Sequence, residues 1–275
     1  MNKTFATLEA PVIAGVIRER TVRDAIAAIR NGEMDGATAF DLHLSCLDDQ
    51  YKNEKSIREI VNCTSKPILA LNYNQRYDLT PFETTEEERV ELLMTAAKAG
   101  VSAVDIQGYT YDLPSKDNYM GNEKYSFTVG NPKEIVTDEA VIAKQMKLID
   151  TFHQMGTEVL FSTHPYIPMN CTQVIELAKF LEKRNPDIIK IITLCENDEQ
   201  MIEAFKTMIE LKKVITDRKI HFHCCGNAGK LTRIINPILG AYMTFCTERY
   251  TLSSNIEQLH LKTTADIIAG IKKIV

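Results

Sequence analysis

Lys190 is the residue whose type conflicts most with its surroundings in this 275-residue sequence. It lies inside the run DIIKIITL, which has the composition of a strand buried on both faces, where an ammonium group is costly. A neutral amine in an apolar pocket is the nucleophile that attacks a ketone to form a Schiff base. The alternative is a structural lysine, either ion-paired or with its charged end at the strand terminus. We expect Lys190→Ala to abolish turnover without unfolding the chain, because the desolvation cost of the charge disappears with it.

His164 is the second candidate, at the end of VLFST in the segment VLFSTHPYIP. The apolar run with Lys190 comes one strand–helix unit later, so the two strands are expected to be neighbours in a parallel sheet. A histidine can take the proton from the carbon beside an imine and later return a proton to a departing hydroxyl. A lone histidine is more often structural, so the interpretation depends on the pairing with Lys190.

Eight short β-branched runs, each followed by a segment of helical period, are predicted to position these residues. The predicted strands are residues 11–17, 37–45, 67–73, 102–107, 158–163, 188–194, 219–225 and 241–246. The predicted helices are residues 21–32, 54–63, 85–99, 138–155, 171–184, 197–214, 229–238 and 262–273, with N-caps at Thr21, Asn170 and Asn197. The acidic run Glu86, Glu87 and Glu88 is expected to be a solvated first turn.

This pattern predicts an α/β protein with a single (β/α)8 TIM-barrel domain over residues 1–275. The rival, a doubly wound open sheet, usually has a G-x-G-x-x-G turn after its first strand, and the sequence has none there. A long loop, about 108–137, follows the fourth strand and contains Tyr109, Tyr111, Tyr119, Tyr125 and Phe127. It is either a partial lid over the site or a surface insertion that packs on its own aromatic residues.

The segments VLFSTHPYIPMN and PDIIKIITLCEND resemble the type I 3-dehydroquinate dehydratases, which are Schiff-base lyases on a (β/α)8 barrel. The resemblance covers nearly the whole chain and implies that Lys190 forms the imine and His164 is the catalytic histidine. The stretch GNAGKLTRIINPILGAYMTFC resembles the next block of that family, which implies that Arg233 binds the substrate carboxylate. Ser253 and Gln258 resemble the closing-loop Ser and Gln, although SSNIEQ is one residue longer than usual. The resemblance also implies a homodimer and no cofactor.

The residues around Arg233 favour an anion site independently of the resemblance. Gly226, Asn227 and Gly229 form a loop-to-helix turn of the kind that binds anions, with Arg233 one turn into the helix. The alternative is an ordinary capped helix with a surface arginine.

The strands that determine substrate specificity depart from the family. Asp41 and His43 stand where a Glu-x-Arg pair is usual, and Tyr73, with Asn72 beside it, stands in place of an arginine. Gln107 replaces an acid. Two guanidinium groups are thereby lost, and neither histidine nor tyrosine reproduces their geometry. We therefore expect 3-dehydroquinate to be a poor substrate.

His221, His223 and Cys225 share one face of their predicted strand, and two histidines at this spacing can bind a metal. No third ligand is tied to them by spacing, so we predict no metal and assign His43, His223 and Cys225 to the polar lining of a substrate pocket.

Charge and cysteine content limit the location and the partners. The formal net charge of −5 argues against nucleic acid or an anionic membrane as a partner. Seven cysteines, without a C-x-x-C motif, indicate reduced thiols, and the N-terminal segment lacks a signal-peptide core. We expect a cytoplasmic protein whose partner is a small-molecule keto substrate that carries a carboxylate.

The sequence therefore predicts a carbon–oxygen lyase that dehydrates a β-hydroxy ketone, 3-dehydroquinate or a related polyol keto acid, through a lysine imine. One alternative is a class I aldolase, which uses the same imine to break a carbon–carbon bond. The other is a pseudoenzyme that binds a ligand without turnover.

Overall fold

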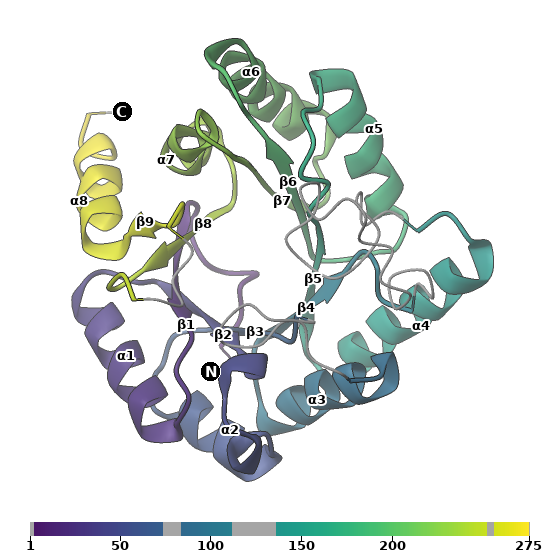
Figure 1. The fold of residues 1–275 in the computed structure, drawn as a ribbon, viewed down its shortest axis with the longest axis vertical. Helices are drawn as coiled ribbons and strands as arrows, with labels where there is room; N and C mark the ends of the chain where they lie inside the picture. The colour runs from purple at the N-terminus through teal and green to yellow at the C-terminus, as the bar shows by residue number, and fades with distance from the viewer. Residues whose placement is uncertain (1–2, 74–83, 112–135, 252–255, 275) are drawn as a thin grey trace. The chain divides into compact units, whose positions relative to one another are not determined.

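The structure, a computed structural model, describes residues 3–73, 84–111, 136–251 and 256–274, in which strands and helices alternate (Figure 1). The strands are β1 (Val12–Ile17), β2 (Ala39–His43), β3 (Ile68–Leu71), β4 (Ala103–Gln107), β5 (Glu158–Thr163), β6 (Ile188–Leu194), β7 (Lys219–Cys225), β8 (Met243–Thr247) and β9 (Leu259–His260). The helices are α1 (Val22–Met34), α2 (Glu54–Asn62), α3 (Glu86–Ala99), α4 (Glu139–Gln154), α5 (Cys171–Glu182), α6 (Asp198–Val214), α7 (Thr232–Leu239) and α8 (Leu261–Ile271). All eight predicted strand–helix pairs are present. The two-residue strand β9 was not predicted, because it is too short to show a periodic pattern.

The chain forms two compact units. Unit 1 comprises Met1–Val104 with Met243–Val275, and unit 2 comprises Asp105–Tyr242. In unit 1, β1 pairs in parallel with both β2 and β8, and β2 pairs in parallel with β3. The pairing of β8 with β1 brings the last long strand of the chain beside the first, as the strand order of a closed barrel requires.

Unit 2 contains the parallel neighbours β5, β6 and β7. Ser162 of β5 faces Lys190 of β6, and Lys190 faces His221 of β7. Helices α5 and α6 lie side by side and contact each other, and α5 also contacts β6 (Figure 1). The side chains of β6 up to Thr193 are buried, as the apolar run predicted.

Helix starts follow the expected capping chemistry. The side chains of Thr21, Asn170 and Asn197 each accept a hydrogen bond from the backbone three residues later, which confirms these three N-caps. The expectation of a solvated acidic turn is wrong for Glu86, which is buried on α3. The guanidinium of Arg89 donates to both Glu86 carboxylate oxygens, at 2.8 and 3.0 Å, and this pairing makes the burial tolerable.

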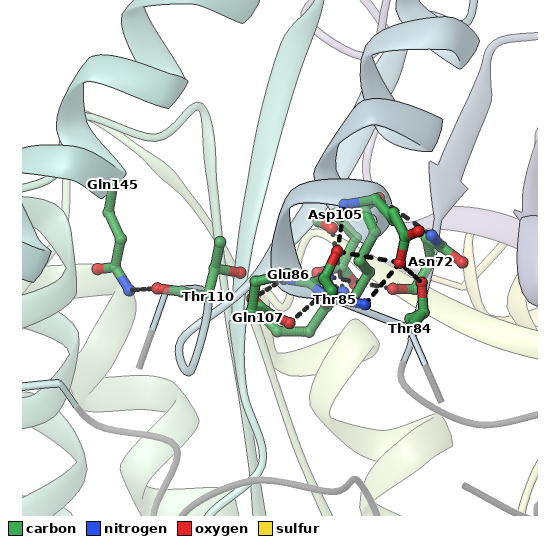
Figure 2. Close-up of polar contacts among 10 residues, drawn as sticks. Asn72, Thr84, Thr85, Glu86, Asp105, Gln107, Thr110 and Gln145 are labelled. Atoms are coloured by element: carbon green, nitrogen blue, oxygen red, sulfur yellow. Dashed lines mark hydrogen bonds and ion pairs between the residues drawn. The ribbon is translucent and has the colours of Figure 1, made fainter. Parts of the chain in front are cut away.

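The long loop that follows β4 is described only at its two ends, since residues 112–135 lie outside the described residues. The Gln145 amide of α4 donates to the carbonyls of Gly108 and Thr110, at 3.0 and 2.9 Å (Figure 2). The Arg184 guanidinium donates to Gln145 Oε1 at 2.8 Å and to the Val136 carbonyl at 2.9 Å. Burial lowers the pKa of Arg184 to about 10, so it keeps its charge at neutral pH. Gln145 and Arg184 thus join the two ends of the loop.

Candidate functional site

Lys190 and Asp105 form a buried ion pair in unit 2. Lys190 Nζ donates to Asp105 Oδ2 at 3.1 Å, and the side chains are 7% and 0% exposed. Ser162 Oγ donates to the other carboxylate oxygen, Oδ1, at 2.5 Å. Gln107 Nε2 donates to the Asp105 carbonyl at 3.0 Å (Figure 2). Sequence analysis did not identify Asp105, although a charged residue within the apolar run AVDI is the same kind of anomaly as Lys190.

His164 comes directly after β5 and is buried. The last paired residue of β5, Thr163, faces Ile191 of β6. Continuing this register by one residue places His164 level with Ile192, which is itself the partner of His223 on β7. The sequence candidates Lys190 and His164 are therefore on adjacent strands and two register steps apart.

The two histidines of β7 are in direct contact. His223 Nδ1 lies 2.7 Å from His221 Nε2, and both side chains are buried. Burial, followed by nearby positive charge, holds the pKa of His223 well below its usual value. The groups that contribute to this shift are Arg233, His221, Lys190 and His164. This set brings four of the sequence candidates together: Lys190, His164, His223 and Arg233.

Arg233, in the first turn of α7, is 5% exposed and is therefore not a surface arginine. Its Nη2 donates to Cys225 Sγ at 3.2 Å, so two residues predicted to bind substrate are in contact.

The turn before α7 has room only for glycine at two positions. Gly226 has φ +92° and a Cβ there would lie 2.5 Å from the Cys195 carbonyl oxygen, while a Cβ at Gly229 would lie 2.7 Å from the Cys224 carbonyl oxygen.

Unit 1 brings Asp41, His43 and Tyr73 together at the ends of β2 and β3. His43 Nε2 lies 3.3 Å from Asp41 Oδ2, and the His43 and Tyr73 rings meet edge to face with centroids 6.2 Å apart. Arg18, directly after β1, belongs to the same group, although sequence analysis did not identify it. Burial lowers the pKa of Arg18, against the opposing effects of Cys46, Asp41 and Tyr73. Its position at the end of a strand was the available signal, because barrel active sites lie at the carboxyl ends of strands.

The remaining predicted residues have other surroundings. Asn72 is buried in unit 1, where its amide donates to the Arg89 carbonyl at 3.0 Å. Gln258 is also buried, and its backbone carbonyl accepts a hydrogen bond from the Tyr250 hydroxyl at 2.7 Å. Ser253 lies outside the described residues.

No group of three or more His, Cys, Asp or Glu side chains in residues 3–73, 84–111, 136–251 and 256–274 is placed to hold a metal ion. None of the helices in these ranges combines the length and the apolar character that crossing a membrane requires. All seven cysteines are free.

Comparison with known proteins identifies a family. A model of the family described as type I 3-dehydroquinase matches residues 13–269. A 3-dehydroquinate dehydratase of Coxiella burnetii is 25% identical over 270 residues, which are 97% of this chain and 96% of that protein. One of Dehalococcoides mccartyi is 24% identical over 237 residues, covering 86% of this chain and 87% of that protein.

Solved structures give the same result for the fold. The 3-dehydroquinate dehydratase of Geobacillus kaustophilus has a TM-score of 0.75 at 12% identity, covering 98% of this chain and 96% of its own. The type I enzyme of Clostridium difficile has a TM-score of 0.74 at 13% identity, covering 98% and 95%. These matches confirm both the resemblance and the predicted (β/α)8 barrel.

Proposed function

Because the chain belongs to the type I 3-dehydroquinase family, a family of hydro-lyases, we propose that it dehydrates a β-hydroxy ketone through a Schiff base on Lys190. The observation that supports this most is the environment of Lys190: a buried amine in the middle of β6, held by one carboxylate and surrounded by further titratable groups. Membership of the family confirms the prediction of a hydro-lyase. The catalytic roles of individual residues are part of the proposal.

The proposed cycle begins when Lys190 transfers a proton to Asp105 and its amine attacks the ketone carbon. The resulting carbinolamine loses water to give an iminium ion. His164 removes the proton from the adjacent carbon, which leaves an enamine. The enamine electron pair expels the β-hydroxyl, and His164 returns its proton so that water departs. Hydrolysis of the remaining iminium frees the enone and regenerates Lys190.

The substrate is proposed to carry a carboxylate, because Arg233 is buried near the imine-forming group and a guanidinium binds a carboxylate in a bidentate pair. The named relatives are dehydratases of 3-dehydroquinate. In this chain, the replacements at His43 and Tyr73 favour a related polyol keto acid over 3-dehydroquinate itself. Arg18 retains one guanidinium beside Asp41 and Tyr73. We also propose a homodimer that needs no cofactor, as the family resemblance implies, and a cytoplasmic location, in keeping with its free cysteines.

Trapping with borohydride tests the imine. Purified protein is reduced in the presence of 3-dehydroquinate at high concentration, and the modified residue is located by mass spectrometry. The added mass is expected on Lys190 and should be absent in Lys190→Met. Lys219 is the internal control, because it is also a partly buried strand lysine of unit 2. An adduct on Lys219 instead, or on any other lysine, would overturn the assignment.

Product analysis separates the alternatives. A dehydratase gives an enone of unchanged carbon count, an aldolase gives two shorter products, and a pseudoenzyme gives neither product nor adduct. With 3-dehydroquinate, kcat/KM is expected to lie at least about 100-fold below the ~10⁴–10⁸ M⁻¹s⁻¹ of ordinary enzymes. The double variant His43→Arg with Tyr73→Arg should raise it. Efficient turnover by the unmodified protein would refute the proposed change of substrate.

A further inference from the structure

His221 and His223, the two histidines of β7, lie beside Lys190 but have no role in the proposed cycle. His221 and His223 are two residues apart on one strand and point to the same side. His221 is the register partner of Lys190, and His223 is the partner of Ile192, two residues further along β6. The pair thus follows Lys190 along the neighbouring strand, in the direction of His164 and Arg233.

We propose that His221 and His223 form a hydrogen-bonding dyad that recognises a hydroxyl group of the substrate held at Lys190. This inference rests on the proposed function, since it names a further feature of the substrate of that site. The dyad determines which substrate is preferred, and His164 carries out the proton transfers of the cycle.

The geometry of the contact determines what the dyad can offer. Two imidazole nitrogens 2.7 Å apart need one hydrogen between them, so one ring donates and the other accepts. If His221 Nε2 carries that hydrogen, the neutral His223 has its own hydrogen on Nε2. If His223 Nδ1 carries it, His223 Nε2 is a bare acceptor. His223 Nε2 is therefore a donor in one tautomeric arrangement of the pair and an acceptor in the other; the change moves the bridging hydrogen, removes the hydrogen on His223 Nε2 and adds one to His221 Nδ1.

His223 Nε2 is the ring nitrogen that the contact of Nδ1 with His221 leaves to interact with a ligand. The side chain is 4% exposed, and among the described residues its bond to His221 is the only hydrogen bond it makes. A polar nitrogen of such a buried side chain costs free energy unless a hydrogen-bonding group, from a ligand, water or the protein, satisfies it. A hydroxyl group both donates and accepts, so it matches His223 Nε2 in either state.

Arg233 is a better partner for a carboxylate than the dyad is. Burial and the nearby groups Arg233, Lys190 and His164 keep His223 neutral, as its lowered pKa indicates. A neutral imidazole binds a carboxylate more weakly than a guanidinium does, and Arg233 supplies the guanidinium. The two groups therefore divide the recognition of a hydroxylated keto acid: Arg233 binds its carboxylate and His223 binds a hydroxyl.

The experiment compares two probes that differ in their hydroxyl groups. One is 3-dehydroquinate, and the other is 3-oxocyclohexane-1-carboxylate, which has the ring, the ketone and the carboxylate but no hydroxyl. Two readouts are taken for each probe: the half-saturating concentration for borohydride trapping, and the dissociation constant by calorimetry without borohydride. The variants are His223→Met, which removes the hydrogen bond at similar volume, and His223→Gln, which keeps an amide donor and acceptor. His153→Gln, on α4, is the control for loss of another histidine of unit 2.

The unmodified protein is expected to prefer 3-dehydroquinate, and His223→Met should reduce this preference about tenfold. His223→Gln should recover much of the preference, and His153→Gln should leave it unchanged. An unchanged preference in a folded His223→Met would overturn the dyad while leaving the imine intact. If no adduct forms but calorimetry still shows a preference that His223→Met loses, the imine is refuted and the dyad stands. The absence of both adduct and binding would overturn both.

Discussion

Removing the carboxylate of Asp105 is the most direct test of how the site is held together. Asp105→Asn keeps the shape of the side chain and an oxygen that can accept from Ser162, but it removes the negative charge beside Lys190. The side chains of the pair are 0% and 7% exposed, so solvent does little to screen the loss. Breaking a buried pair by removing one partner typically costs about 3–5 kcal/mol, because a charge is left without compensation.

The same argument corrects the expectation that Lys190→Ala leaves stability unaffected. That expectation treated Lys190 as an isolated buried charge, whereas the structure gives it a carboxylate partner at 3.1 Å. Lys190→Met should therefore also cost about 3–5 kcal/mol, because it leaves the Asp105 carboxylate buried alone. The double variant should lose much less than the sum of the two single variants, with a coupling energy above about 2 kcal/mol.

Urea unfolding of the unmodified protein, the two single variants and the double variant measures this coupling. Fluorescence and circular dichroism should be followed together, since a two-state free energy requires coincident transitions. The matched control is the exposed pair of Glu210 with Lys213 on α6, where the side chains are 38% and 58% exposed. Glu210→Gln should cost no more than about 1 kcal/mol. If Asp105→Asn and Lys190→Met were as mild as this control and additive, the buried-pair argument would be refuted.

Three further predictions concern His164, His223 and Arg184. His164→Ala should still form an adduct on Lys190 but should lose turnover on the order of 10³-fold, whereas a nearly normal rate would identify another group as the base. Because the pKa of His223 is lowered from 6.5 in the folded chain, the unfolded chain binds its proton first and stability should fall below pH 6.5, by up to about 1.4 kcal/mol per pH unit. Urea unfolding of His223→Gln should show a shallower decline, and equal slopes would contradict this. Arg184→Leu should cost about 1–3 kcal/mol by leaving Gln145 Oε1 unsatisfied, and hydrogen exchange at residues 108–111 should accelerate. Unchanged exchange would show that the loop end is held by other contacts.

The alternation of strands and helices could be predicted because it depends on local sequence. Each buried strand is a short apolar run, and each helix begins at a residue such as Thr21 or Asn170 whose side chain can cap it. Glu86 shows where local rules fail. Its place in a first turn suggested solvation, but Arg89 three residues later pairs with it and allows it to be buried. The sequence shows that Glu86 and Arg89 are three residues apart and can pair on one helix face, but it does not show that this face is buried.

The sequence could show which charged residues of the candidate site lie in apolar strands, but not which of them contact each other. Lys190 was identified because a charge in an apolar strand needs a reason, and the same reasoning applies to Asp105 on β4, 85 residues earlier. Sequence alone does not say which charged strand residues meet, since that depends on the register between strands. The alternation on β7 likewise places His221 and His223 on one face, but their hydrogen bond depends on ring orientation.

A buried charge in a strand is therefore better treated as one half of a pair than as an isolated anomaly. Isolated burial of an ammonium or a carboxylate costs several kcal/mol, which is a large part of the 5–15 kcal/mol that stabilises a typical domain. A sequence with one such residue in an apolar strand should contain its partner in another apolar strand. For Lys190 the structure identifies that partner as Asp105, and their ion pair allows the amine that the proposed cycle needs to be held inside the fold before substrate arrives.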